Sequence, residues 1–264
     1  MLKIDRLFGV LDEIAPISLS YKLVESGDYD NSGVLINCHS DVENVLFSLD
    51  FSIQAIKKAK SLKCDTIVTH HPAIYTPQKS ISYEDETSAS VLLAIKNDLN
   101  VISMHLNLDM ATTGTDYQFC KGLGGEKYKI LEYMDEEHGY GREFDIENVK
   151  LSEFVARIKK QFNTKRVVVY GNKNAVLTKG ASFCGGGSDH ALKSVKKGKT
   201  SAQVIVTSDM PHHVIKELVE AGKNVVLVTH YASENYGFKK YFEQVKNDLK
   251  NKVNAFYFED KRFM

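Results

Sequence analysis

The chain has 264 residues, of which 43% are hydrophobic, and its 34 basic and 34 acidic side chains leave a formal net charge of zero. That length allows one large domain or two domains of ordinary size. A nucleic-acid binder usually shows a basic excess, which is missing here, and no apolar run is long enough to span a membrane. The first residues lack the apolar region of a signal peptide, so we expect a cytoplasmic protein with neither nucleic acid nor membrane as partner.

The cysteines give the same picture of the compartment. Cys38, Cys64, Cys120 and Cys184 are scattered along the chain and form no Cys-x-x-Cys pair. That pattern fits neither a disulfide framework nor a thiolate zinc site. We therefore expect four reduced thiols.

Helices and strands alternate in the first half. Residues 4–14 are predicted as an amphipathic helix that ends at Pro16. The turn signal Asp30-Asn31-Ser32-Gly33 precedes the first strand. The further elements expected here are strands at 34–37, 45–49, 66–69 and 101–104 and helices at 53–62 and 88–99.

The composition becomes polar and charged at 126–147, after Gly122-Leu123-Gly124-Gly125. We place a domain boundary there, with a first domain at 1–124 and a second at 125–244, and expect 245–264 to pack back on the first. A helix with Ser152 as N-cap opens the second half. The elements expected after it are strands at 167–170, 181–184, 204–206, 225–228 and 255–258 and helices at 213–221 and 233–249. The alternation predicts two associated α/β domains with largely parallel pairing.

The two halves echo each other. A strand ending Ile-Val-Thr-His-His is followed by a helix and by a strand that ends at His105, with Asp109 four residues later. In the second half, a strand ending Ile-Val-Thr-Ser-Asp is followed by a helix and by a strand that ends at His230, with Glu234 four residues later. This pattern predicts a duplicated unit whose site-bearing edges face each other, with the site between the domains.

Imidazole and carboxylate side chains follow these strands. Because ligands gather at the carboxyl ends of strands in open α/β sheets, His70, His71, Asp109, His230 and Glu234 are candidate ligands of two divalent metals. This donor set suits zinc, manganese or iron. Each residue also has an ordinary interpretation: hydrogen-bonded histidines, a capping Asp109, or a Glu234 that favours the helix dipole.

Other polar residues near these segments have weaker assignments. His105 is better suited to contacting a ligand or carrying a proton than to binding metal directly. The loop Gly185-Gly186-Gly187-Ser188 is interpreted first as a tight strand-to-helix turn and second as an anion-binding loop. Capping or surface roles are expected for Asp209, His212 and His213.

The chain resembles the GTP cyclohydrolase 1 type 2 homologs, also called the NGG-interacting-factor-three-like proteins. The resemblance covers nearly the whole sequence and rests on six short segments. They are Asp30-Asn31-Ser32-Gly33, Leu49-Asp50, Ile67-Val68-Thr69-His70-His71-Pro72, His105-Leu106-Asn107-Leu108-Asp109, Gly185-Gly186-Gly187 and His230-Tyr231-Ala232-Ser233-Glu234. It implies a two-domain α/β protein with two metals at the domain interface, held by His70, His71, Asp109, His230 and Glu234. It also implies a homohexamer.

Three functions are compatible with these expectations. The first is a dinuclear metal-dependent hydrolase of a nucleotide substrate, with ring opening of GTP and release of formate as the family name suggests. The second is a two-metal phosphatase or phosphodiesterase. The third is a metal-binding scaffold or regulatory ring without catalysis, in which the metal stabilises the fold. Ser208, where many relatives have Gly, and Ser32, where Val is common, are departures that leave the substrate open.

Overall fold

The computed structural model describes residues 1–264, which divide into two compact units. Unit 1 comprises Met1–Ala111 and Phe238–Asp260, and unit 2 comprises Thr112–Gly237 and Lys261–Met264. The division after Ala111 comes earlier than the expected position 124. The return to unit 1 begins at Phe238, inside the last helix, instead of at 245.

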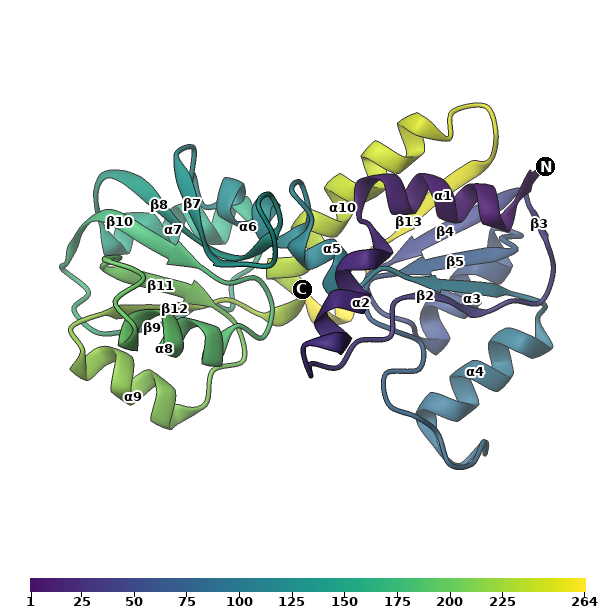
Figure 1. Cartoon of the computed structure of the whole chain (residues 1–264), viewed down its shortest axis with the longest axis horizontal. Coiled ribbons are helices and arrows are strands. Elements are labelled where there is room, and N and C mark those ends of the chain that lie inside the picture. The colour runs from purple at the N-terminus through teal and green to yellow at the C-terminus, as the bar shows by residue number, and fades with distance from the viewer. The chain divides into compact units, whose positions relative to one another are not determined.

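Unit 1 is built on a five-stranded sheet in the order β13-β4-β5-β6-β2 (Figure 1). Its strands are β2 (Gly33–Ile36), β4 (Asn44–Ser48), β5 (Thr66–Thr69), β6 (Asn100–Ser103) and β13 (Asn254–Phe258). The pairs from β13 to β6 are parallel, and β2 is antiparallel to β6. A separate two-stranded ribbon pairs β1 (Leu2–Lys3) with β3 (Asp41–Val42).

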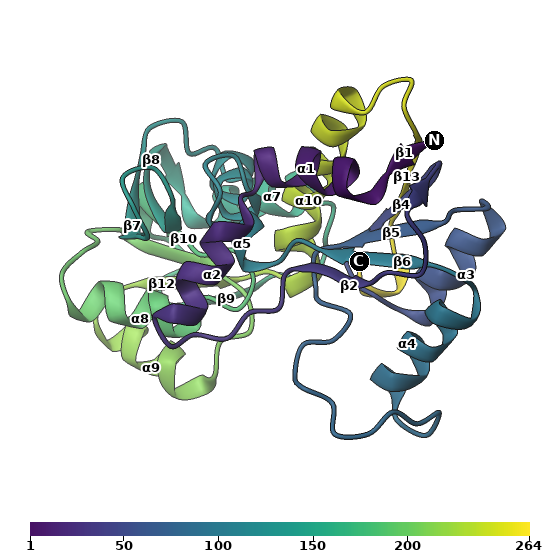
Figure 2. The ribbon, with the colours of Figure 1, turned by 45° about the vertical axis from the view of Figure 1, so that its right-hand side comes forward.

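Helices cover both faces of this sheet. They are α1 (Ile4–Ile14), α2 (Ile17–Glu25), α3 (Ile53–Ser61), α4 (Glu86–Lys96) and α5 (Leu106–Met110). Figures 1 and 2 show α3 and α4 on one face and α1 on the other. An aromatic cluster fills the core where Phe47 of β4 lies against Phe238 and Phe242, with ring centroids 6.2 and 5.2 Å away.

Unit 2 contains a six-stranded sheet in the order β7-β8-β10-β11-β12-β9. Its strands are β7 (Tyr128–Tyr133), β8 (Gly139–Lys150), β9 (Val168–Tyr170), β10 (Val176–Ser182), β11 (Val204–Thr207) and β12 (Asn224–Leu227). The three strands β10, β11 and β12 are parallel, while β7, β8 and β9 run antiparallel to their neighbours. Its helices are α6 (Thr115–Gly122), α7 (Leu151–Gln161), α8 (Ser188–Lys196) and α9 (His212–Glu220). The long helix α10 (His230–Asp248) begins in unit 2, and a short 3-10 helix occupies Lys261–Phe263.

The α/β class is confirmed, but the expected largely parallel pairing is wrong, because both sheets mix parallel and antiparallel pairs. The polar segment 126–147 forms strands β7 and most of β8, because Arg142 and Glu143 are buried with polar partners. The first helix ends before Pro16 as expected, and helix α2, for which no element was expected, begins directly after that proline. The N-cap of α7 is Lys150 instead of Ser152, which lies inside the helix.

The cysteines and the helices have the properties expected from the sequence. All four cysteines are free thiols, three of them buried. Burial raises the pKa of Cys64 and Cys120 to about 12, so both remain protonated near neutral pH. Every helix is too short or too polar to cross a bilayer.

Candidate metal centre

The carboxyl ends of β5 and β6 bring the candidate ligands of unit 1 together. These strands are parallel neighbours, and Thr69 pairs with Ser103 at their ends. His70 and His71 follow β5 directly, whereas His105 follows β6 and precedes the short helix α5. Adjacent parallel strands present their exits at one edge, so the chain topology places these imidazoles side by side.

His70, His71 and His105 form a compact cluster. The ring centroid of His70 lies 5.0 Å from that of His71 and 5.3 Å from that of His105. One ligand atom from each of the three residues lies within 4.8 Å of the others. Nε2 of the fully buried His70 is 3.5 Å from Oδ1 of Asp109. A group of this composition and size could hold a metal ion.

Each ring in the cluster is oriented through its Nδ1 atom. Nδ1 of His70 lies 2.8 Å from the Met104 carbonyl oxygen. Nδ1 of His71 lies 2.7 Å from Oδ1 of Asp50, and Nδ1 of His105 lies 2.7 Å from Oδ1 of Asp30. An oxygen acceptor at Nδ1 favours the tautomer that carries its proton there and leaves the Nε2 lone pair for a metal.

Asp30 is held as a carboxylate. Burial works against its ionisation, but hydrogen bonds from His105, Ser20 and Ser32 outweigh that effect and lower its pKa. The hydroxyl of Ser32 also accepts a hydrogen bond from the His105 backbone N–H at 3.1 Å. The turn before β2 therefore fixes both the ring and the backbone of His105.

Unit 2 presents a different set of donors at the ends of β11 and β12. His230 and Glu234 lie four residues apart on α10, and Nε2 of His230 is 2.8 Å from Oε1 of Glu234. Nδ1 of His230 contacts Oδ2 of Asp209, which follows β11. Glu234 is buried, while the His230 side chain is about one-third exposed. A carboxylate and an oriented imidazole thus share one turn of a helix.

The glycine loop lies against these two residues. Gly185 has φ +64°, and a Cβ on it would lie 2.2 Å from Oε1 of Glu234 and 3.4 Å from Nε2 of His230. Its N–H donates to the hydroxyl of Ser233 at 3.1 Å. Only glycine combines this backbone conformation with so close an approach. The loop is the tight turn expected first, because the Gly187 N–H returns to the Gly185 carbonyl at 3.0 Å.

The structure groups the predicted ligands by unit. His70, His71 and Asp109 come together in unit 1, where His105 joins them as a full member of the histidine cluster. His230 and Glu234 come together in unit 2. His212 and His213 are exposed on α9, as expected.

Three aspartates that support the histidines were missed. Asp30 was noted only as part of a turn signal and Asp50 only as part of a segment that carries the family resemblance, and Asp209 was given a capping or surface role. Asp209 is exposed, but its carboxylate contacts His230. Two of them could have been found from their positions, since Asp50 and Asp209 each come two residues beyond the end of a core strand.

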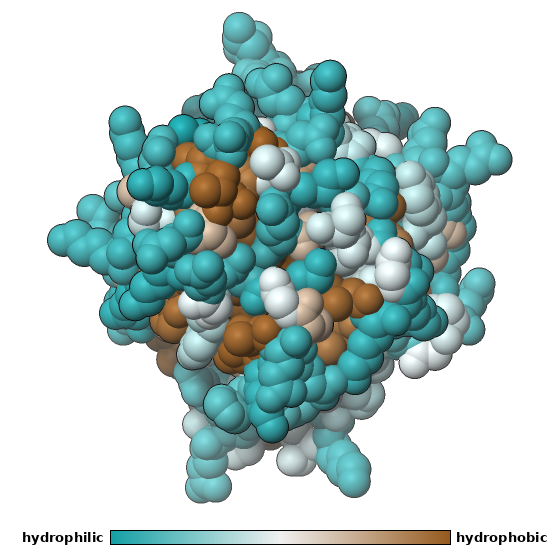
Figure 3. Space-filling model, turned by 90° about the vertical axis from the view of Figure 1, so that its left-hand side faces the viewer, coloured by the Kyte–Doolittle hydropathy of each residue, from teal (hydrophilic) through white to brown (hydrophobic).

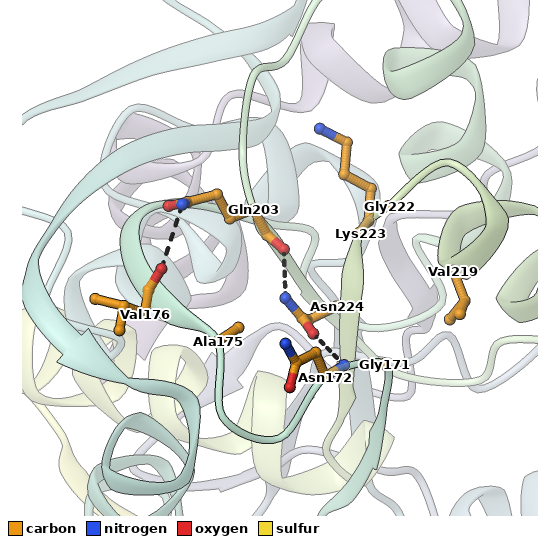
Figure 4. Close-up of a pocket in the computed structure, with 9 residues that line it drawn as sticks. All are labelled: Gly171, Asn172, Ala175, Val176, Gln203, Val219, Gly222, Lys223 and Asn224. Atoms are coloured by element: carbon orange, nitrogen blue, oxygen red, sulfur yellow. Dashed lines mark hydrogen bonds between the residues drawn. The ribbon is translucent and has the colours of Figure 1, made fainter.

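Unit 2 also has a shallow pocket of about 660 Å³, drawn in Figure 4. It lies at the amino ends of β11 and β12, where Asn224 donates to the Gln203 carbonyl at 3.1 Å and accepts from the Asn172 N–H at 2.8 Å. No histidine or carboxylate lines it, so it is no metal site. Figure 3 shows unit 2 from the left of Figure 1, with hydrophobic patches divided by polar side chains.

Comparisons with known proteins place this geometry in context. A family model described as Duf34/NIF3 (NGG1p interacting factor 3) matches residues 2–262. A Clostridium perfringens protein named GTP cyclohydrolase 1 type 2 homolog is 28% identical over 256 residues, covering 96% of this chain and 94% of that protein. A Methanocaldococcus jannaschii protein of the same name is 28% identical over 222 residues, covering 83% and 87%. The crystal structure of a Bacillus cereus protein related to NIF3 shares the fold, with a TM-score of 0.88 at 17% identity over 98% and 97% of the two chains.

Proposed function

Because the chain belongs to the Duf34/NIF3 family over nearly its whole length, we propose that it is a metal-dependent hydrolase with a nucleotide substrate. The observation that carries the proposal is the cluster of His70, His71 and His105. Each of these rings has Nδ1 against an oxygen, and their ligand atoms gather within 4.8 Å of one another. Histidines that only stabilise a core have no need of this shared arrangement.

We propose that two divalent cations are held by His70, His71 and Asp109 of unit 1 with His230 and Glu234 of unit 2. The donors are imidazole nitrogens and carboxylate oxygens, which fit zinc, manganese or iron. Such cations supply Lewis-acid chemistry and lower the pKa of coordinated water. Asp50 and Asp209 then orient His71 and His230.

The reaction proposed is the hydrolytic opening of the guanine ring of GTP. Its support is the name of the curated relatives, which are 28% identical to this chain. In that reaction water adds to C8, the five-membered ring opens, and a second water releases formate. We assign the proton transfer to His105, a member of the histidine cluster whose Nδ1 lies 2.7 Å from the ionised Asp30.

We also propose that the two units arose by duplication. In each unit an antiparallel edge strand precedes three parallel strands that are connected by two helices: β2 before β4-β5-β6, and β9 before β10-β11-β12. The edge strand pairs with the last parallel strand in both cases.

The experiment combines elemental analysis with product detection on purified protein. We expect about two transition-metal ions per chain and formate release from GTP in the wild type, with both lost in the double variant His70→Ala/His230→Ala. His213→Ala, at an exposed histidine of α9, is the control that keeps both.

The product decides among the remaining functions. Phosphate or a nucleoside monophosphate in place of formate would replace ring opening by phosphoester hydrolysis. Bound metal without turnover of any nucleotide, together with a lower melting temperature for His70→Ala, would overturn the enzymatic proposal in favour of a metal-binding scaffold.

A further inference from the structure

Two half-exposed tyrosines lie beside the histidine cluster of unit 1. Tyr75 is 46% exposed and Tyr29 is 41% exposed. Their ring centroids are 5.2 Å apart with planes at 83°, and the Tyr75 ring lies 5.9 Å from that of His105 at 87°. Neither neighbour therefore occupies a parallel stacking position on Tyr75.

The turn before β2 fixes this aromatic pair to the metal centre. Tyr29 packs against Tyr75, and the side chain of Asn31 donates to the Ile74 carbonyl at 2.5 Å. Asp30 lies between Tyr29 and Asn31 in the sequence, and its Oδ1 is 2.7 Å from Nδ1 of His105. One short segment thus orients a reactive-site histidine and holds the backbone next to Tyr75.

We propose that Tyr29 and Tyr75 form the subsite that binds the planar heteroaromatic base of the nucleotide. This inference rests on the proposed function and names the group that the chain recognises. Exposed aromatic rings bind bases by stacking, because every base has a π-face, and a preorganised ring loses little entropy on binding. The pair lies one ring contact from His105, so a base stacked there sits beside the candidate metal centre.

The surrounding loop offers a matched control. Tyr83 lies in the same connection between β5 and α4 and is 68% exposed, more than Tyr75. The Tyr83 ring contacts neither the histidine cluster nor Tyr29. Its replacement removes an exposed tyrosine from the loop without changing the proposed subsite.

The test compares guanosine monophosphate with ribose 5-phosphate, which lacks the base, by calorimetric titration of the full chain as purified. The wild type is expected to bind the nucleotide more tightly. Tyr75→Ala should raise the Kd of guanosine monophosphate about tenfold and leave that of ribose 5-phosphate unchanged. Tyr75→Phe and Tyr83→Ala should bind both probes as the wild type does, and the metal content should be the same in all variants.

Several results would overturn the subsite. They are a Tyr75→Ala variant that binds guanosine monophosphate normally, an equal loss for both probes, or a wild type that binds neither. A change of oligomeric state in Tyr29→Ala/Tyr75→Ala, measured by light scattering, would assign the pair to a contact between copies of the chain. Base-dependent binding without hydrolysis would keep the subsite and sink the proposed activity. Nucleotide hydrolysis that is unaffected by Tyr75→Ala would keep the proposed activity and overturn the subsite.

Discussion

The two units use similar strand order to present different ligand chemistry. In unit 1, β5 is followed by His70 and His71, and in unit 2 the equivalent exit of β11 carries Ser208 and Asp209. The strand ends of unit 1 are consequently rich in imidazole, whereas those of unit 2 carry His230, the buried Glu234 and an exposed aspartate that contacts His230. The strand framework thus sets where candidate ligands appear, while two or three loop residues set which side chains they are.

The largest expected change in stability concerns the buried ion pair that lies next to the glycine loop of unit 2. Asp116 and Arg142 form a buried ion pair, and Asp116 also accepts from the Cys184 N–H at 3.0 Å, next to Gly185. Asp116→Asn leaves the Arg142 charge buried without its counter-charge and should lower the free energy of unfolding by about 3–5 kcal/mol. Urea denaturation measures the loss. Asp145→Asn, at an exposed carboxylate of β8, should change it by less than about 0.5 kcal/mol.

The second prediction concerns the close approach of the glycine loop to Glu234 and His230. Gly185→Ala introduces a Cβ against Glu234 at a positive φ, so it should cost about 1–3 kcal/mol of stability and weaken metal binding. A Cβ on the adjacent Gly186 would meet no atom within 4 Å, and Gly186→Ala should therefore be nearly neutral. Equal effects of the two substitutions would show that the approach of Gly185 to Glu234 is unimportant.

A third comparison sets the supporting aspartates of the two units against each other. Asp50→Ala and Asp209→Ala each remove the partner of a histidine Nδ1 and should weaken zinc binding by about 10–100-fold. The loss should be smaller for Asp209, whose side chain is 60% exposed against 33% for Asp50, because water can replace it more readily. Competition with a chromophoric chelator measures both, with the exposed Asp28→Ala as control. Unchanged affinity in both variants would contradict the supporting role.

The smallest effect concerns acid stability of unit 2. Burial opposes the ionisation of Glu143, but hydrogen bonds from Thr200, Ser201 and Lys129 lower its pKa to about 2 from 4.5. A depressed folded-state pKa stabilises the protein above pH 4.5, and this contribution is lost as the pH falls towards 2. The free energy of unfolding should therefore fall more steeply over that range in the wild type than in Glu143→Gln. Parallel curves for the two proteins would exclude this source of acid sensitivity.

Hydrophobic periodicity was sufficient for most of the framework. Strand β5 was predicted at its observed bounds, and the core strands β4, β6, β11 and β12 within about one residue, because each is a short β-branched or apolar run between turn signals. Strand β8 was missed because Arg142 and Glu143 are polar, and their burial depends on partners distant in sequence.

The site was predictable only in part for a related reason. A histidine at the end of a strand can be recognised from its position, as His70 and His230 were. The aspartate that orients it lies on another segment, 21 residues away for both His71 and His230 and 75 for His105. Such pairings follow from three-dimensional adjacency, which local patterns do not encode.

The place of β13 in unit 1 has a consequence for folding. This strand pairs with β4, so residues about 210 positions apart must meet before the sheet is complete. During synthesis the buried strand β4 therefore presents an open edge while the whole of 112–237 is made. An unpaired, apolar strand edge promotes intermolecular pairing. Chains released before residues 254–258 are added should thus be prone to aggregation and depend on chaperones for their solubility.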